Sequence, residues 1–362
     1  MKKMKIGIVG CGDISGIYMK NLQTAFADRA EVIAVAARTM SNVEKKAAQY
    51  GIPKALTVDE LMADPDIELV LNLTIPAAHY EINKKALLVG KHVYSEKPLA
   101  IELEDGQELL ALAAEKGLMI GCAPDTVMGG ALQLCRHLIE ESAIGKPLSA
   151  EVTLHKHGPE SEHPAPAFLY QHGAGPVFDY GPYYLSALVS LLGPVREVCT
   201  MSGKGFETRT CTVPGPNEGV SFPVEVPTHV TGTALLESGA LATITFSFDR
   251  WTTREDRMVI YGTEGTLYLG NPDQFGDTVR LMKADESEPS VVQNELAFNE
   301  NSRGLGVWDM IGAIEDGRKP VASGTIALHV LEIMHALIRS GEEKRFVKIE
   351  SACSQPPVFQ KG

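Results

Sequence analysis

The chain has 362 residues, of which 44% are hydrophobic, and its formal net charge is -13 at pH 7. This length and apolar content are sufficient for a large buried core and suggest two domains rather than one. A nucleic-acid partner is not expected, because phosphates require a basic surface and this acidic sequence has no Lys/Arg cluster. We therefore expect small-molecule partners.

The amino-terminal stretch and the cysteines narrow the class further. In MKKMKIGIVG, lysines precede an apolar stretch that glycines interrupt, and the stretch is too short for a signal-peptide core or a membrane span. The six cysteines form no CxxC pair, so the sequence indicates neither a disulfide framework nor a zinc site. We expect a cytoplasmic protein with reduced thiols, no metal and no membrane attachment.

Short apolar strands alternate with amphipathic helical segments from residue 4 to about 120. The expected strands are KIGIVG, EVIAVAA, LVLNLTI, HVYSE and LMIGC. This alternation is typical of βαβ units. We predict a doubly wound parallel α/β sheet that forms a dinucleotide-binding domain over residues 1–122.

The pattern changes after residue 122, where a helix at about 129–141 is followed by strands with period-2 alternation. Alternate residues of ALATITFSF share one face: Ala240, Ala242, Ile244, Phe246 and Phe248. Helical spacing recurs over 304–317 and 325–341, and each segment ends on a glycine suited to a helix C-cap. We expect residues 123–362 to form an α+β domain with a large, mainly antiparallel open sheet. Its uncovered face predicts a homodimer or homotetramer.

The stretch IGIVGCGDIS, residues 6–15, follows a strand and precedes a helix, in the place of the fingerprint G-x-G-x-x-G/A. Gly10 permits the tight turn, Gly12 lets the backbone approach a pyrophosphate, and the small Ser15 lets the helix pack closely. With Asp13 and Ile14 at the helix N-terminus, this turn predicts a bound dinucleotide. A purely structural turn is the alternative.

The end of the second strand bears on the choice between NAD and NADP. An acidic residue there accepts the ribose 2′-OH, whereas an arginine accommodates a 2′-phosphate. Here Ala37 stands in the place of the acid, and Arg38, Thr39 and Ser41 follow. The sequence favours NADP(H), with NAD(H) as the alternative if Arg38 stacks on the adenine instead.

The fourth expected strand ends in HVYSEKPLA, at the sheet edge where such folds bind ligands. Pro98 forces Lys97 into extended geometry and so fixes the direction of its side chain; a cis bond is one of the options. Taken alone, Glu96 and Lys97 would be an exposed charge pair. The strand-end position favours a functional lysine.

IGIVGCGDIS, the EKP at 96–98 and GAGPVFDYGPYY from residue 173 together resemble the Gfo/Idh/MocA family of oxidoreductases over nearly the whole chain. The resemblance implies a Rossmann domain, a C-terminal domain whose open sheet forms oligomers, and hydride transfer between a nicotinamide and a hydroxyl-bearing carbon. It also implies that Lys97 holds the reacting oxygen and assists proton transfer, and that Glu96 lies near the cofactor.

The second family motif, G-G-G-x-x-x-D-x-G-x-H, reads here GAGPVFDYGPY, so Tyr183 replaces the usual histidine. Some relatives also carry tyrosine here. A tyrosine has a pKa of about 10, which a nearby Lys97 ammonium would lower, so either group is a candidate proton carrier. Pro182 suits a first helical turn, and Asp179 suits either a helix cap or a substrate contact.

Helical spacing divides the residues after this motif into two faces. The apolar face carries Leu185, Leu188, Val189 and Leu192, and the polar face carries Asp179, Tyr183, Ser186 and Ser190. We expect the polar face to be turned toward the substrate.

Three further segments carry candidate contacts. TIPAAHY resembles the family's T-P-x-x-x-H loop, which implies that Thr74, Pro76 and His79 line the cofactor; packing under the next helix is the alternative for His79.

Asp125 is expected either to face the substrate or to start the next helix. In the histidine-rich stretch 155–172 no first shell for a metal is complete, so we choose His163 and Tyr170 as substrate contacts.

These patterns together predict an NADP(H)-preferring oxidoreductase that acts on a sugar, inositol or related polyol. Lys97 and Tyr183 form the acid-base pair, and Asp179 orients the substrate through a neighbouring hydroxyl. Two alternatives belong to other classes: a catalytically silent nucleotide sensor, and a glycosidase that retains its nucleotide.

Overall fold

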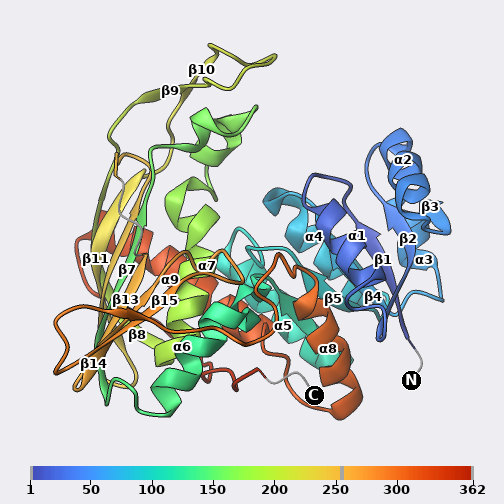
Figure 1. Ribbon diagram of the computed structural model, residues 1–362. Helices are drawn as coiled ribbons and strands as arrows, with labels where there is room; N and C mark the ends of the chain where they lie inside the picture. Colours follow the sequence, from blue (N-terminus) through green and yellow to red (C-terminus); the bar gives the residue numbers. More distant parts are fainter. Residues whose placement is uncertain (1–2, 253–256, 360–362) are drawn as a thin grey trace. The chain divides into compact units, whose positions relative to one another are not determined.

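The computed structural model describes residues 3–252 and 257–359 and divides into two compact units (Figure 1). The described residues of the first unit are 3–129 and 300–331, and those of the second are 130–252, 257–299 and 332–359. Residues 1–2, 253–256 and 360–362 fall within the expected domains but lie outside the described residues.

The first unit contains a six-stranded parallel sheet in the order β3-β2-β1-β4-β5-β6. Its strands are β1 (Met4–Val9), β2 (Ala30–Ala36), β3 (Lys54–Leu56), β4 (Leu69–Asn72), β5 (His92–Ser95) and β6 (Ile120–Cys122). The strand order reverses between β1 and β4, which confirms the doubly wound α/β prediction. The sequence missed β3, which has three residues and none of them buried.

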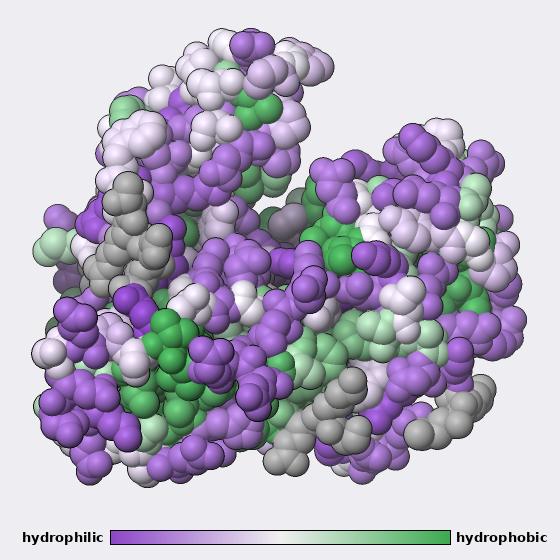
Figure 2. Space-filling view, in the orientation of Figure 1, coloured by the Kyte–Doolittle hydropathy of each residue, from purple (hydrophilic) through white to green (hydrophobic). Residues whose placement is uncertain are grey.

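Five helices connect these strands and a sixth comes from a distant part of the chain. They are α1 (Ser15–Gln23), α2 (Met40–Tyr50), α3 (Val58–Ala63), α4 (Pro76–Leu88), α5 (Leu103–Lys116) and α8 (Leu305–Asp316). The outer surface over α2 is hydrophilic, in keeping with its exposed polar residues (Figure 2).

The expected division at residue 122 differs from these compact units. Residues 123–129 and 300–331 belong to the first unit because they bond to each other and to β6. Asp125 accepts hydrogen bonds from the backbone of Gly304 and Gly306, and the Cys122 amide donates to the Ala322 carbonyl. These bonds join parts of the chain that local sequence patterns do not connect.

Over its described residues, the second unit contains a nine-stranded sheet in the order β16-β15-β14-β13-β7-β12-β11-β8-β17, in which only β7 and β12 pair in parallel. Its strands are β7 (Pro147–His155), β8 (Val195–Gly203), β11 (His229–Leu236), β12 (Leu241–Ser247), β13 (Met258–Gly262), β14 (Gly265–Leu269), β15 (Val279–Lys283), β16 (Ser290–Val291) and β17 (Val347–Lys348). Strands β9 (Thr208–Thr210) and β10 (Ser221–Pro223) form a separate hairpin beyond one end of the sheet (Figure 1). The prediction of a large, mainly antiparallel sheet is confirmed.

Helices α6 (Gly130–Glu140) and α7 (Gly175–Leu192) lie on one face of this sheet (Figure 1). The alternating residues expected to share a face are all buried: Ala240, Ala242, Ile244, Phe246 and Phe248. The intervening residues Leu241 and Thr243 are exposed, so the opposite face of β12 is open. Short 3-10 helices follow β6 (Asp125–Met128) and β7 (Pro159–Ser161 and Pro166–Tyr170).

The glycines near the two last helices differ in role. Gly317 ends α8 in the left-handed conformation, with φ of 65°, as predicted for a C-cap. Gly341 was expected to end a helix but lies inside α9 (Gly324–Glu343). A Cβ at Gly341 would lie 2.5 Å from the Ser202 hydroxyl oxygen, so glycine there permits close packing against β8. No helix in the described part of the chain is long and apolar enough to cross a bilayer.

Candidate active site

The turn after β1 passes close to the backbone at the end of β4. Gly10 has φ of +119°, and a Cβ on it would lie 2.4 Å from the Leu73 carbonyl oxygen. The Gly10 amide donates to the Ala36 carbonyl at 2.8 Å. Only glycine adopts this positive φ without strain and leaves room for the Leu73 carbonyl. Gly10 therefore fixes the turn between the ends of β2 and β4.

Gly12 leaves an open space at the start of α1. A Cβ built at this exposed residue would meet nothing within 4 Å. Ser15 is fully buried and donates a 2.6 Å hydrogen bond from its hydroxyl to the Gly12 carbonyl, so the turn is tied to the helix. Asp13 is exposed and Ile14 is the half-buried N-cap. An accessible glycine backbone beside a helix N-terminus fits a dinucleotide pyrophosphate.

The end of β2 presents polar groups to solvent. Ala37 follows the strand and is half-buried, whereas Arg38, Thr39 and Ser41 are exposed. Thr39 is the N-cap of α2, but its side chain does not cap the helix. A guanidinium and two hydroxyls are therefore available here for an anion.

A buried amide holds the loop after β4. The Asn72 side-chain oxygen accepts from the Thr74 hydroxyl at 2.7 Å and from the Thr74 amide at 3.1 Å, and its NH₂ group donates to Asn83 at 2.8 Å. Thr74 and Pro76 are half-buried, and Pro76 begins α4. Asn72 was not among the predicted site residues, although an amide inside the apolar run LVLNL is a detectable signal.

His79 points into the protein interior. It is fully buried, with Nδ1 2.6 Å from the Pro98 carbonyl and Nε2 3.0 Å from the Thr74 carbonyl. Burial lowers the pKa of His79, and the two carbonyls oppose that effect. Of the two roles considered, this geometry supports packing: His79 links the loop after β4 to the turn after β5 and is not directed at a ligand.

Hydrogen bonds to the buried Glu96 carboxylate hold the Glu96–Pro98 turn. Glu96 is 8% exposed; its carboxylate accepts from the Tyr18 hydroxyl at 2.8 Å and from the Lys97 amide at 3.0 Å. Burial and the neighbouring Glu96 charge raise the pKa of Tyr18, which therefore remains a donor. Lys97 is half-buried between buried neighbours, and its bond to Pro98 is cis. Glu96 is thus an anchor for the lysine and not half of an exposed charge pair.

Asp125 has a structural role in the first unit. It is 1% exposed and accepts from the Gly304 and Gly306 amides at 2.8 and 3.2 Å, so it caps α8 and not the helix that follows it in sequence. Burial raises the pKa of Asp125 to about 6 although these amides oppose the shift. Its hydrogen bonds and burial do not support the expected contact with substrate.

In the second unit, α7 begins earlier than the sequence suggested. Its N-cap is Ala174 and Pro176 lies in its first turn, so Asp179 is not a cap and Pro182 lies in the helix interior. The rigid φ of proline suits a first turn, and Pro176 already supplies it. At Pro182 no N–H is available for the Phe178 carbonyl four residues earlier.

Only a narrow strip of α7 is accessible in this unit. Of its 18 residues, all of them described, Asp179, Tyr180 and Tyr183 are half-buried and the rest are buried. Ser186 and Ser190, expected on the polar face, are 5% and 4% exposed, because α6 and the C-terminal segment pack there. Asp179 and Tyr183 do lie on one strip, and Tyr180, which lies between them, was not predicted.

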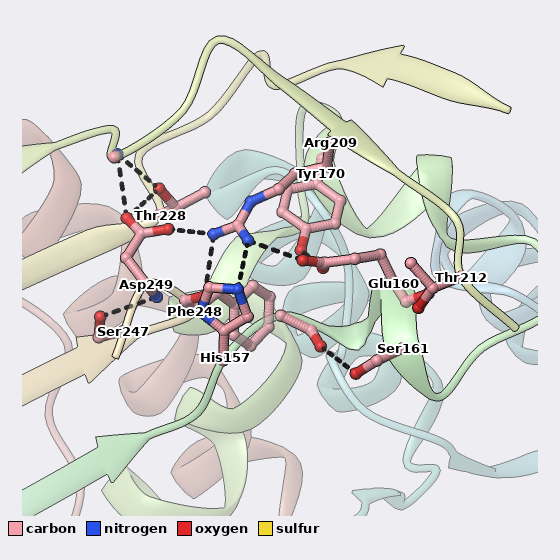
Figure 3. Close-up of polar contacts among 12 residues, drawn as sticks. His157, Glu160, Ser161, Tyr170, Arg209, Thr212, Thr228, Ser247, Phe248 and Asp249 are labelled. Carbon is pink, nitrogen blue, oxygen red and sulfur yellow. Dashed lines mark hydrogen bonds and ion pairs between the residues drawn. The ribbon is translucent and has the colours of Figure 1, made fainter. Parts of the chain in front are cut away.

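The histidine-rich stretch leads into a buried ion network (Figure 3). Tyr170 is fully buried and its hydroxyl donates to Glu160, which also accepts from Arg209 at 2.7 Å. The Arg209 guanidinium bonds to Asp249 on its other side and so ties β9 to the end of β12. Tyr170 is therefore a support of this network, which explains its position better than the expected substrate contact.

His163 lies at the surface of the same stretch. It is half-buried, its Nδ1 accepts from the Ala165 amide at 3.0 Å, and its ring packs edge-on against Phe168. In the described part of the chain, no group of three or more His, Cys, Asp or Glu side chains is arranged to hold a metal ion. The histidines are thus placed individually and not as a cluster.

Comparison with known proteins agrees with both units. Residues 4–123 match a family model described as an oxidoreductase family with an NAD-binding Rossmann fold, and residues 132–268 match the GFO/IDH/MocA C-terminal domain. The chain belongs to the Gfo/Idh/MocA family. It is accordingly an NAD(P)-dependent oxidoreductase that acts on CH–OH groups.

Similar members of the family are named for sugars and polyols. The chain is 28% identical over 358 residues to 1,5-anhydro-D-fructose reductase of Ensifer adhaerens, covering 95% of this chain and 98% of the relative. It is 24% identical over 361 residues to myo-inositol 2-dehydrogenase of Thermotoga maritima, covering 96% and 99%. Levoglucosan dehydrogenase in complex with NADH has the same fold, with a TM-score of 0.83 at 19% identity over 97% of this chain and 100% of that one.

The predicted site residues thus form two groups. The first unit holds the glycine turn, Arg38 and the loops that carry Thr74 and Lys97, and the second holds the strip of Asp179 and Tyr183. Lys97 and Tyr183 belong to different units, so their pairing as acid and base stays a prediction.

Proposed function

We propose that this enzyme prefers NADP(H) and interconverts a CH–OH group and a carbonyl in a sugar, inositol or related polyol. The observation that carries the proposal is the anchoring of Lys97 at the carboxyl end of β5 by the buried Glu96 carboxylate. A lysine whose backbone is held in this way projects its side chain from a fixed point at the end of β5. The names of the sugar and polyol relatives support the substrate class.

The cofactor preference is argued from the surface after β2. Arg38 offers a guanidinium to a 2′-phosphate, and the Thr39 and Ser41 hydroxyls offer further donors. The position that would carry an acid for the ribose of NAD is Ala37. The Gly10 turn, with Gly12, Asp13 and Ile14, would hold the pyrophosphate.

The reaction needs one proton and one hydride. A nicotinamide held by the glycine turn would supply the acceptor or donor of the hydride. Lys97 donates hydrogen bonds to the reacting oxygen. In the oxidation direction the proton of that oxygen passes either to Lys97 in its neutral amine form or to Tyr183 as a phenolate. Asp179 binds a neighbouring hydroxyl and so orients the ring.

A substrate panel tests this function. Purified enzyme is mixed with NADP or NAD and with D-glucose, myo-inositol or levoglucosan, and with NADPH and 1,5-anhydro-D-fructose, while the reduced-nicotinamide absorbance band is followed. We expect turnover of at least one compound and a lower KM for NADP(H) than for NAD(H). Nucleotide binding without any absorbance change would indicate a sensor, and copurified nucleotide that is not consumed would indicate a redox glycosidase.

We also propose that the enzyme is a homodimer or homotetramer through the open face of the nine-stranded sheet. Met201 on β8 and Leu241 on β12 are 77% and 57% exposed on this face. Exposed apolar residues on an uncovered sheet are typical of an interface. Met201→Arg combined with Leu241→Arg should shift the mass measured by light scattering toward the monomer, and a monomeric wild-type protein would contradict the proposal.

A further inference from the structure

A lysine and a tyrosine meet beside the accessible strip of α7. The Lys156 Nζ lies 2.8 Å from the Tyr180 hydroxyl oxygen, 5.1 Å from the centre of its ring and 2.5 Å from a Glu162 carboxylate oxygen. Lys156 follows β7, and its backbone bonds to Ser247 and Arg250. Its side chain is 18% exposed, so the ammonium is held on the tyrosine from a defined position.

The direction of this hydrogen bond leaves the tyrosine proton available. The ammonium can only donate, so the Tyr180 oxygen accepts. Among the residues that the structure describes, Tyr180 has no acceptor for its own O–H, and its ring packs edge-on against Phe248 at 6.2 Å. Burial raises the pKa of Tyr180, and Lys156 lowers it only in part, so the phenol keeps its proton at neutral pH.

Tyr180 shares its exposed side with the two predicted substrate contacts. A helix turns by about 100° per residue, so Asp179, Tyr180 and Tyr183 fall within one arc of about 100°. The Lys156 charge is balanced by Glu162, so the group behind the phenol brings no net charge. Such a donor suits a neutral oxygen better than a carboxylate or a phosphate.

We propose that Tyr180, oriented by Lys156, is a specificity residue that donates a hydrogen bond to a neutral hydroxyl or ring oxygen of the substrate. This inference rests on the proposed function, because it assigns a second substrate oxygen to the strip that carries Asp179 and Tyr183. Tyr180 contacts the substrate, whereas Lys156 acts through it as a positioning residue.

The test is a double-mutant cycle in which one change removes a group from the enzyme and the other removes an oxygen from the substrate. KM and kcat are measured for D-glucose, levoglucosan and myo-inositol and for their monodeoxy derivatives, with wild type, Tyr180→Phe and Lys156→Met. We expect Tyr180→Phe to raise KM for a parent compound about 3- to 10-fold with little change in kcat, as for one lost hydrogen bond. For the one derivative that lacks the contacted oxygen, wild type and Tyr180→Phe should have the same KM. Lys156→Met should reproduce this pattern.

Tyr184→Phe is the matched control, because it makes the same chemical change one residue further along α7. Tyr184 is buried and its hydroxyl contacts Asn271, so KM should not change. If the wild type turns over the panel, three results for Tyr180→Phe would overturn the inference alone. These are an unchanged KM, an equal rise in KM for every derivative, and a loss confined to kcat. Absence of wild-type turnover on the whole panel would overturn the proposed function, and the inference with it.

Discussion

The loops of the first unit and the strip on α7 hold the predicted site residues by different means. In the first unit, Thr74 and Lys97 are anchored through buried polar groups, chiefly Asn72, His79 and Glu96. On α7, Asp179 and Tyr183 stand on a helix whose other faces are packed in the interior. Hydrogen bonds to buried polar groups fix the direction of the loop backbone, whereas close apolar packing fixes the position of the helix. Substitutions should therefore act differently in the two regions.

The largest effect is expected at the anchored lysine of the first region. Lys97→Met should lower kcat by about 10² to 10⁴, the range for a positioned acid-base group, and leave nucleotide affinity unchanged. Lys116→Met, an exposed lysine of the same unit, is the control and should leave kcat unchanged. Steady-state kinetics and nucleotide titration provide both values, and a Lys97→Met enzyme with wild-type turnover would remove Lys97 from the mechanism.

The residues at the strand ends could be predicted from sequence because a strand's end fixes where the next residues lie. Gly10, Gly12 and Lys97 each lie within three residues of the end of a short strand, so their positions at the sheet edge required no long-range information. The anchors behind them did require it. Tyr18 and Glu96 are 78 residues apart, and Asp125 and Gly304 are 179 apart, so no local pattern connects them.

On α7 the spacing placed Asp179 and Tyr183 on one strip, but the predicted start of the helix was wrong. Asp179 and Tyr183 share a strip, as their spacing predicted, but Ser190 fits the same spacing and is buried. Helical periodicity shows which residues share a face, and packing by other elements decides whether that face is accessible. Here Arg136 and Gln355 cover the end of the helix by bonding to the Ser190 carbonyl.

A buried polar anchor of the first region should produce a pH-dependent stability. Burial raises the pKa of Asp125 to about 6, so the native state holds its proton more tightly than the unfolded chain does. This contribution is complete below about pH 4, the unfolded value, and is lost as pH rises through 6, a change of about 3 kcal/mol. The asparagine side chain of Asp125→Asn does not titrate, so this variant lacks the pH-dependent contribution.

Urea unfolding of wild type and Asp125→Asn at several pH values checks this prediction. The free energy of unfolding of wild type, relative to the variant, should fall between pH 4 and pH 7. The difference removes the contributions of other carboxyl groups, such as Asp64, whose pKa a hydrogen bond from Lys54 lowers. A difference that does not depend on pH would show that the pKa of Asp125 is not raised in the native state.

The smallest effect is expected where a side chain is neither anchored nor packed. Arg38→Ala should raise KM for NADP roughly 10-fold, because one exposed charged contact is lost, and should leave KM for NAD unchanged. Lys45→Ala, an exposed cation on α2, is the control. Equal changes for both nucleotides would contradict recognition of a 2′-phosphate by Arg38.

We propose that Lys97 and Tyr183, one in each unit, act on the same substrate oxygen. A double-mutant cycle on kcat, with Lys97→Met, Tyr183→Phe and both changes together, tests this pairing. If the two groups transfer one proton as a unit, the double variant should be at most about 10-fold slower than the slower single variant. A loss equal to the product of the two single losses would mean that the groups act independently, and would contradict the account.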